Sequence, residues 1–460
     1  RVRAMRLLGR EGLSVFNPFA PAPHVERLPD DEVRRIYPRL RWQILESTFI
    51  GYAVYYLVRN NVGVVAKDMK ETLGYNDTDL GNILAATAIS YGIGKFLMGA
   101  LSDRSNPRVF MGVGLLLTAF CNFAFGASAD YSTHFYLWIL NGLFQGMGWS
   151  PCGRSMGHWF SEKERGVSFS IWNTSHNLGG GIAGVIAAES AIRLGGWQYA
   201  FYVPGMLAVI GAFYLFVRLR DTPQSVGLPP IEEYRDDYTD YEREHGVNER
   251  ELSFRELLLN NVLFHKWIWL LAIANFFAYI TRYAMIDWGP LYLHEVKGAT
   301  VSKGGIAVLL LEWGGIPSTI FLGWVSDKLG GRRGMIAAIC MIPIIAAYAM
   351  ILIIPPGYLP LDMMMLIVIG FFIYPVINLI TIIALDLTSK KAIGTAAGFI
   401  GLLGYLGRTT HAKGFGAMLT HYKEIYDVQT AWNYVIAATL ASTIIAFVLL
   451  LFTWKVKPRA

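Results

Sequence analysis

The amino-acid sequence predicts an all-α membrane protein with twelve transmembrane helices in two pseudo-symmetric six-helix bundles. Hydrophobic stretches of about 20 residues, the length that crosses a bilayer as a helix, recur along nearly all of the 460 residues. A charged, proline-containing segment divides these stretches into two sets of six, and short patterns in the first set return in the second.

Composition supports a polytopic helical membrane protein. Hydrophobic residues make up 54% of the chain and charged residues 16%, whereas soluble domains carry about 25% charge. An outer-membrane barrel would instead show short alternating segments. The formal charge of +6 is ordinary for basic membrane-flanking loops, so we expect the lipid bilayer as a partner and no nucleic acid. The three cysteines are expected to be free thiols.

The predicted domains follow from these stretches. They are an N-terminal cytoplasmic arm at 1–43 without a signal-peptide core, bundles at 44–219 and 263–454, a cytoplasmic linker at 220–262 and a cytoplasmic tail at 455–460. The predicted helices span 44–66, 80–101, 108–127, 132–154, 166–190, 197–219, 263–293, 303–325, 334–354, 362–387, 393–419 and 429–454. Sixteen charged residues between positions 220 and 256, eleven of them acidic, predict a solvated linker.

Lysine and arginine predict the orientation. With both termini cytoplasmic, the short cytoplasmic segments contain twelve of these residues and the loops on the other side contain six. Because cytoplasmic loops are enriched in positive charge, we expect the termini and the linker on the cytoplasmic side.

The two halves repeat each other. Gly99-Ala-Leu-Ser-Asp-Arg104 returns as Gly323-Trp-Val-Ser-Asp-Lys328, a shift of 224, and Leu178-Gly179 returns as Leu406-Gly407, a shift of 228. Parallel repeats of this kind place a substrate site where the halves meet. The acid–base loops of the first repeat predict gating or structural ion pairs, formed by Asp103, Arg104, Asp327 and Lys328.

Two arginines interrupt hydrophobic stretches at matching positions. Arg59 and Arg282 are 223 residues apart. A charge at membrane depth costs at least about 2.5 kcal/mol unless it faces a cavity or a counter-charge. The matched pair therefore predicts an anion held between the halves, although a structural ion pair with Asp287, Glu312 or Asp386 is the alternative for either arginine.

Polar side chains share helical faces with the arginines. Three helices carry pairs at i, i+3 or i+4 and one carries a triplet at i, i+4, i+7, which places each set on one face: Tyr52, Tyr56 and Arg59; Tyr91 and Lys95; Asn173 and His176; Tyr279 and Arg282. Arginine forks bind phosphate oxygens in pairs, and lysine adds a point charge. The alternatives to an anion-binding role are structural: Lys95 snorkels or pairs locally, and His176 is a packed, hydrogen-bonded histidine.

The chain resembles the organophosphate:phosphate antiporter family of the major facilitator superfamily. The resemblance lies in seven stretches: Gly51–Arg59, Asp103–Arg108, Gln145–Arg154, Lys163–Gly166, Trp172–Gly181, Arg220–Tyr234 and Gly394–Gly398. It implies the major facilitator fold and exchange of an organic phosphate ester, glycerol-3-phosphate being expected, for inorganic phosphate. It further implies that Arg59, Arg282, Lys95 and His176 hold the phosphate, and that Tyr52, Tyr56, Tyr91, Asn173, Tyr279, Tyr374 and Tyr405 line the pocket.

Two departures from the family pattern leave the organic part of the substrate open. Asn60 follows Arg59 where the glycerol-phosphate branch tends to have a second cation, and Arg408, His411 and Lys413 enter a run that is usually apolar. Hexose phosphates and phosphoglycerate remain alternatives, as do a sugar-phosphate sensor of the same fold and a proton symporter using Asp287 or Glu312. We find no catalytic set, metal spacing or cofactor loop, so we expect a monomeric carrier without cofactor rather than an enzyme.

Overall fold

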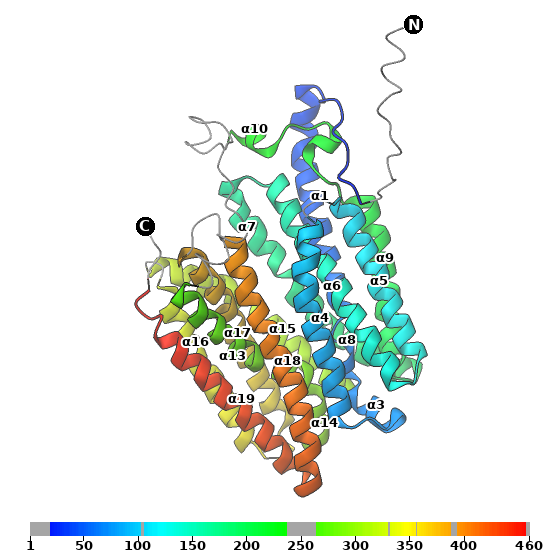
Figure 1. The fold of residues 1–460 in the computed structure, drawn as a ribbon, viewed down its shortest axis with the longest axis vertical. Helices are drawn as coiled ribbons and strands as arrows, with labels where there is room; N and C mark the ends of the chain where they lie inside the picture. The colour runs from blue at the N-terminus through cyan, green and yellow to red at the C-terminus, as the bar shows by residue number, and fades with distance from the viewer. Residues whose placement is uncertain are drawn as a thin grey trace.

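The computed structural model describes residues 19–102, 105–236, 264–329, 332–355, 357–387 and 393–456. Within these ranges the chain is helical and contains no strand. Figure 1 shows two bundles side by side, the N-terminal half in blue to green and the C-terminal half in green to red. We call the end of the molecule where α1 begins and α19 ends the terminal face, and the opposite end the distal face.

The N-terminal half contains the first nine α-helices. Their bounds are α1 Asp30–Leu57, α2 Asn61–Val64, α3 Ala66–Leu73, α4 Asp77–Ser102, α5 Pro107–Ala127, α6 Tyr131–Trp159, α7 Glu162–Asn173, α8 Ser175–Leu194 and α9 Tyr199–Arg218. The short helices α2 and α3 lie at the distal face, while α7 and α8 follow one another along a single predicted span.

The C-terminal half follows the linker, whose described part holds a 3-10 turn at Pro223–Val226 and α10 at Ile231–Arg235. The bounds of the later helices are α13 Lys266–Asp287, α14 Gly289–Lys297, α15 Val301–Lys328, α16 Arg333–Ile353, α17 Leu359–Leu387, α18 Ile393–Ile425 and α19 Val428–Leu451.

Every predicted span corresponds to one long helix or to consecutive helices, so the predicted fold class is confirmed. The first predicted start is wrong: α1 begins at Asp30 rather than at residue 44, and Pro38 lies inside it. The acidic first turn of Asp30, Asp31 and Glu32 suits the positive end of a helix dipole. Seven described helices are long and apolar enough to cross a membrane by length and composition alone.

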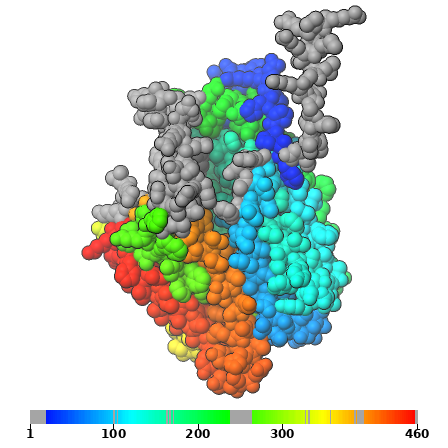
Figure 2. Space-filling model, viewed as in Figure 1, coloured from blue at the N-terminus to red at the C-terminus, as the bar shows by residue number. Residues whose placement is uncertain are grey.

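The halves meet along two seams. Helix α4 lies against α18, and α8 lies against α15; Figure 2 shows the first seam between the blue and orange surfaces. A Cβ at Gly305 would lie 2.5 Å from the carbonyl oxygen of Gly184, and one at Gly81 would lie 2.6 Å from that of Ala412. These glycines allow the backbones of opposite halves to approach closely, as small residues do between membrane helices.

The first part of the linker is fastened to the N-terminal half. The buried carboxylate of Asp221 accepts from the backbone N–H of Ala22 at 2.8 Å and pairs with Arg154 of α6 at 3.0 Å. Tyr37 of α1 donates to the carbonyl of Pro229 at 3.0 Å and stacks on Tyr234 with ring centroids 4.0 Å apart. These contacts make residues 221–235 part of the N-terminal bundle's terminal face.

We expect Asp221→Ala to lower the melting temperature of the purified protein. The substitution leaves Arg154 without its carboxylate in a mostly buried position, and breaking such a pair costs about 3–5 kcal/mol when both charges are buried. Thermal unfolding measured by intrinsic fluorescence tests this, with the exposed Glu26→Ala as the matched control. Equal melting temperatures for the two variants would contradict the fastening of the linker.

Candidate functional site

Arg59 lies in a break between two helices. Helix α1 ends at Leu57 and α2 begins at Asn61, so the carbonyls before the break lose their helical partners. The carbonyl of Val58 instead accepts from Asn122 of α5 at 3.2 Å and from Asn141 of α6 at 3.1 Å. Side-chain amides of two neighbouring helices therefore hold the broken backbone in place inside the bundle.

The Arg59 side chain is 3% exposed and has no carboxylate partner among the described residues. Its Nε donates to Oε1 of Gln145 at 3.0 Å, while Nε2 of Gln145 donates to the carbonyl of Tyr55. Its guanidinium carbon lies 4.2 Å from the ring centres of both Tyr56 and Tyr91. Both terminal nitrogens are buried without a hydrogen-bond partner.

Arg282 projects from the unbroken helix α13 of the other half and is 5% exposed. Its guanidinium carbon lies 4.3 Å from the ring centre of Tyr374 and 4.9 Å from that of Tyr283. Nε and one terminal nitrogen have no hydrogen-bond partner. That nitrogen lies 3.8 Å from Oε1 of Glu312, which is an ion-pair contact rather than a hydrogen bond.

Glu312 is a buried carboxylate, 1% exposed, that contacts both halves. Asn177 of α8 donates to its Oε2 at 3.2 Å and to its backbone carbonyl at 3.1 Å. Tyr374 of α17 donates its hydroxyl hydrogen to the same Oε2. Oε1, which faces Arg282, has no hydrogen bond. One of the carboxylates predicted as a possible counter-charge therefore lies beside Arg282 without saturating it.

His176 connects the surroundings of the two arginines. Its ring centre lies 5.8 Å from that of Tyr56, which Arg59 covers, and 5.9 Å from that of Tyr374, which Arg282 covers. The ring nitrogen Nδ1 bonds to the carbonyl of Asn173 across the junction between α7 and α8. The histidine thus lies between the two guanidinium-bearing sides of the interface.

The remaining predicted pocket tyrosines extend the same aromatic cluster across the interface. Tyr405 of α18 lies 4.7 Å from Tyr91 of α4 and 5.3 Å from Tyr279 of α13, between ring centres. Tyr52 lies 5.0 Å from Trp172 and 5.5 Å from Tyr56. The structure therefore brings all six predicted tyrosines into one contiguous group with the arginines.

Lys95 lies at the edge of this group. Its Nζ is 4.2 Å from the ring centre of Trp149, and the side chain is half-buried. Trp149 in turn contacts Trp172 at 6.4 Å between ring centres. Within the part of the chain that the structure describes, Lys95 has no carboxylate partner, so its charge remains available to an anion.

Charged residues join the halves at the distal face. Lys70 lies 2.7 Å from Asp77 and 2.9 Å from Glu295, while Lys423 lies 2.8 Å from Asp77 and 2.6 Å from Glu295. Lys70 and Asp77 belong to the N-terminal half, and Glu295 and Lys423 to the C-terminal half. We call these four residues the distal ion-pair ring. Trp432 also donates to Glu295, at 2.7 Å.

Glu295 and Lys70 of the distal ion-pair ring stay charged at neutral pH. Burial alone would raise the pKa of Glu295, but Lys423 and Lys70 outweigh it and hold the pKa below 4.5, its ordinary value. Burial lowers the pKa of Lys70, yet Asp77 and Glu295 raise it above 10.5. A depressed acid pKa and a raised base pKa make the contact persist between these two values and weaken only beyond them.

Of the predicted gating residues, Asp103 and Arg104 are outside the described residues, as is the side chain of Asp327. Lys328 ends α15 at the terminal face, is exposed and has its Nζ 4.4 Å from the ring centre of Trp324.

The sequence contains no comparable signal for the distal ion-pair ring, because Glu295 and Lys423 lie on helices far along the chain from Lys70 and Asp77.

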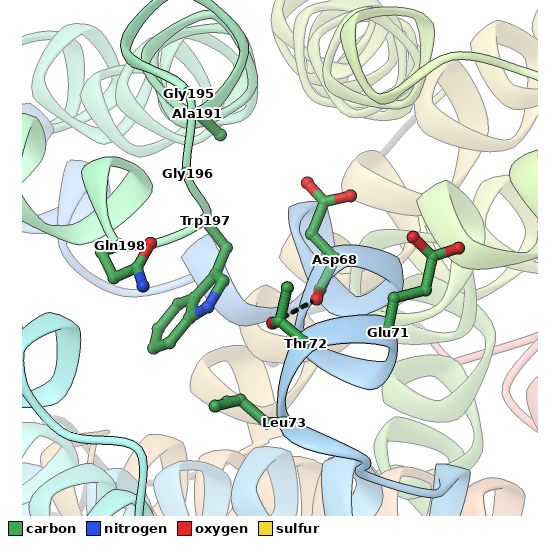
Figure 3. A pocket seen from close by; sticks show the side chains of 9 residues that line it. All are labelled: Asp68, Glu71, Thr72, Leu73, Ala191, Gly195, Gly196, Trp197 and Gln198. Atoms are coloured by element: carbon green, nitrogen blue, oxygen red, sulfur yellow. Dashed lines mark hydrogen bonds between the residues drawn. The ribbon is translucent and has the colours of Figure 1, made fainter.

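A separate hollow of about 500 Å³ opens between α3 and the turn after α8. Figure 3 shows the carboxylates of Asp68 and Glu71 beside Trp197 and Gln198. Two carboxylates repel an anion, so this hollow does not compete with the arginine pair as an anion site. Among the described residues, no group of three His, Cys, Asp or Glu side chains is placed to hold a metal ion.

The geometry defines a cationic, hydroxyl-rich site at the interface of two helical bundles. Buried guanidinium N–H groups without partners are rare, because each costs about 1–3 kcal/mol or more in desolvation. Here such groups come from both halves, and aromatic faces contribute about 0.5–2 kcal/mol per contact to holding the charges. The arrangement suits an oxyanion that accepts hydrogen bonds from both halves.

The sequence pattern of the Major Facilitator Superfamily matches residues 48–410. The chain belongs to this superfamily, and to the branch of it that includes phosphate-ester transport proteins. It is 41% identical to the glycerol-3-phosphate transporter of Bacillus subtilis (97% of this chain, 99% of the relative). It is 39% identical to a probable hexose phosphate transport protein of Chlamydia pneumoniae (95% and 96%) and 34% identical to the membrane sensor protein UhpC of Escherichia coli (85% and 89%).

Solved structures agree on the fold. A bacterial homolog of the human lysosomal transporter Spinster, in an inward-facing and occupied conformation, superposes with a TM-score of 0.66 at 16% identity, covering 90% of this chain and 96% of that one. The predicted family and fold are therefore confirmed, and the protein is a multi-pass membrane protein of a transporter superfamily rather than of an enzyme family.

We expect Arg59, which has no carboxylate partner among the described residues, and Arg408, which has one, to respond oppositely to removal of their charge. Arg59→Met removes a cation whose terminal nitrogens are unpaired, so the melting temperature stays equal or rises. Arg408 pairs with the buried Asp287 at 2.7 Å, so Arg408→Met leaves that carboxylate without its partner and lowers the melting temperature. An unpaired buried charge costs about 3–5 kcal/mol. Thermal unfolding of both variants in the same detergent checks this. A larger loss for Arg59→Met would show that Arg59 stabilises the fold.

Proposed function

We propose that the protein is a secondary transporter that exchanges an organic phosphate ester, most simply glycerol-3-phosphate, for inorganic phosphate by alternating access. The single observation that carries the proposal is the pair Arg59 and Arg282. Each presents unpaired guanidinium nitrogens at the interface, and they come from opposite halves. The 41% identity to a glycerol-3-phosphate transporter over 97% of the chain supports the substrate class.

A phosphate dianion between the arginines would explain exchange. In the empty site the two cations repel one another, and Glu312 offsets only part of the charge on Arg282. A bound oxyanion would accept from both guanidiniums and join the halves. The loaded carrier would then pass through the occluded state more readily than the empty one, because a ligand shifts a conformational equilibrium by its differential affinity for the two states.

His176 has a place in this exchange. It lies between Tyr56 and Tyr374 at the point where both halves face the proposed phosphate position. Lys95 would add a further cation from the edge of the site.

We place the protein in the inner membrane of a bacterium with its terminal face toward the cytoplasm, because basic residues concentrate at that face. Both relatives named as transporters are bacterial. In this orientation the distal ion-pair ring faces the outside and closes the outer entrance.

The second candidate is a membrane sensor for a sugar phosphate. The 34% identity to the sensor UhpC over 85% of the chain favours it, because a sensor would use the same anion site. Counterflow separates the candidates. Vesicles loaded with phosphate should take up labelled glycerol-3-phosphate, glucose-6-phosphate or phosphoglycerate if the protein is a carrier, and the preferred ester identifies the substrate. A sensor would bind an ester without turnover.

Arg59→Lys and Arg282→Lys should each reduce phosphate exchange by about two orders of magnitude. Lysine keeps the charge but loses the planar fork that engages two phosphate oxygens. Phosphate:phosphate exchange in reconstituted vesicles measures the effect, and Lys413→Gln, an exposed cation on α18, is the control. Near-normal exchange by either lysine variant would exclude a bidentate clamp.

A disulfide across the distal seam should stop exchange reversibly. The hydroxyl of Thr78 in α4 donates to that of Thr420 in α18 at 2.8 Å, so the two β-carbons face each other across the halves. Oxidised Thr78→Cys/Thr420→Cys protein should lose exchange and recover it on reduction, since alternating access requires this seam to open.

The single-cysteine variants are the controls, and the native Cys121, Cys152 and Cys340 are buried. Undiminished exchange by the cross-linked protein, with cross-linking confirmed on a gel, would argue against opening of the distal seam.

A further inference from the structure

Arg408 of α18 is a third buried guanidinium near the proposed site, 2% exposed. Unlike Arg59 and Arg282, it is saturated. Its Nε lies 3.1 Å from Oδ2 of Asp287 and one terminal nitrogen lies 2.7 Å from Oδ1, a two-point ion pair within the C-terminal half. No Arg408 nitrogen is left unpaired among the buried atoms of the described chain. This geometry therefore does not favour a direct role of Arg408 in holding the anion.

The same terminal nitrogen of Arg408 reaches across the interface to Asn60. The distance to Oδ1 of Asn60 is 3.3 Å. Asn60 is the residue after Arg59, in the break between α1 and α2. In the break, the backbone N–H of Arg59 bonds back to the carbonyl of Tyr56 at 3.3 Å in a turn, and the helix does not continue. Contacts with neighbouring helices therefore contribute to where Arg59 points.

Arg408 also touches the partner of the second arginine. Its guanidinium carbon lies 4.0 Å from the ring centre of Tyr283, and that of Arg282 lies 4.9 Å from the same ring. The two guanidinium carbons are therefore no farther apart than the sum of these distances. One side chain thus contacts the backbone neighbour of Arg59 and the aromatic neighbour of Arg282.

The backbone around Asp287 packs directly against α2. A Cβ at Gly63 would lie 2.5 Å from the carbonyl oxygen of Asp287, so only glycine allows this approach of the two halves. The Arg408–Asp287 pair and Asn60 therefore form a contact between the halves on the distal side of Arg282, five positions further along α13.

We propose that Arg408, held by Asp287, is a positioning residue that sets the distance between the two phosphate-binding arginines through Asn60 and Tyr283. This inference rests on the proposed function. The ion pair is internally neutral, so its effect on a bound anion comes from geometry rather than from added charge. Loss of the contact to Asn60 lets the segment between α1 and α2 shift. The guanidinium groups of Arg59 and Arg282 then no longer bind the same oxyanion.

The test compares five variants in phosphate:phosphate exchange. Asn60→Ala removes only the acceptor in the opposite half, and Arg408→Lys keeps the charge but cannot bond to Asp287 and Asn60 at once. Both should raise the KM for phosphate about tenfold, the usual effect of losing a hydrogen bond to a charged group, with the maximal rate changed less than threefold. Lys413→Gln should match the wild type.

The decisive variant is the charge-balanced pair Arg408→Gln/Asp287→Asn. Arg408→Gln alone leaves Asp287 unpaired and should lower both protein yield and exchange. The double variant restores charge balance, so a purely structural role predicts recovery of both the yield and the wild-type KM. A positioning role predicts recovery of the yield with the KM still raised about tenfold.

The outcomes separate the two proposals. If the wild type exchanges phosphate and Asn60→Ala and Arg408→Lys keep a KM within twofold of it, the positioning role is overturned while the proposed function stands. If the wild type neither exchanges phosphate nor gains thermal stability from it, the proposed function is overturned and this inference with it. A wild-type KM in the double variant also overturns the positioning role.

Discussion

The structure depends on keeping two permanent cations in the membrane interior without giving either a full counter-charge. A guanidinium does not lose its proton, so the protein cannot relieve the cost by neutralising it. Arg59 donates one hydrogen bond to the neutral amide of Gln145 and lies against two aromatic faces. These contacts hold the charge in place but leave its terminal nitrogens free. An oxyanion completes what the protein leaves unsatisfied, which is the physical basis of the proposed specificity.

The two halves solve this problem differently despite their repeat. In the N-terminal half, the helix breaks at Arg59, and the amides of Asn122 and Asn141 take over the freed carbonyl of Val58. In the C-terminal half, α13 continues through Arg282, and Glu312 lies 3.8 Å from the cation. Arg282, on the unbroken helix, has a partly compensated charge, and Arg59, in the break, has an uncompensated one. The broken segment is thus held by side chains of α5 and α6 rather than by its own helix.

The sequence predicted the features that depend on local pattern. The length of the apolar stretches predicted the helices, and spacing predicted Tyr56 and Arg59 on one helical face. The guanidinium of Arg59 does cover the Tyr56 ring, but Arg59 lies in the break after Leu57 rather than on the helix. The sequence did not predict this break, because neither proline nor glycine occurs at residues 58–60. The start of α1 was missed because the charged residues before position 44 contain no long apolar stretch, whereas the structure begins the helix at Asp30.

The supporting side chains were less predictable than the arginines themselves. Gln145 looks like an ordinary polar residue in a glycine-rich helix, and its role follows only from its position opposite the break. Likewise, Lys70 and Glu295 are 225 residues apart and share no pattern, yet they lie 2.9 Å apart. A single sequence contains no periodicity that joins such residues. Arg408 was visible as a departure, but Asp287 as its partner was not.

The positions of these contacts suggest how switching can be easy. The side chains of the distal ion-pair ring are only 4–21% exposed, but each of its four charges contacts two of opposite sign, so the ring is internally neutral. The centre is different, because Arg59 and Arg282 lack full counter-charges and their interaction with an anion would be screened little. In the proposed exchange, the free energy that decides between open and closed states would therefore come mainly from the bound oxyanion, while the ring would close the entrance.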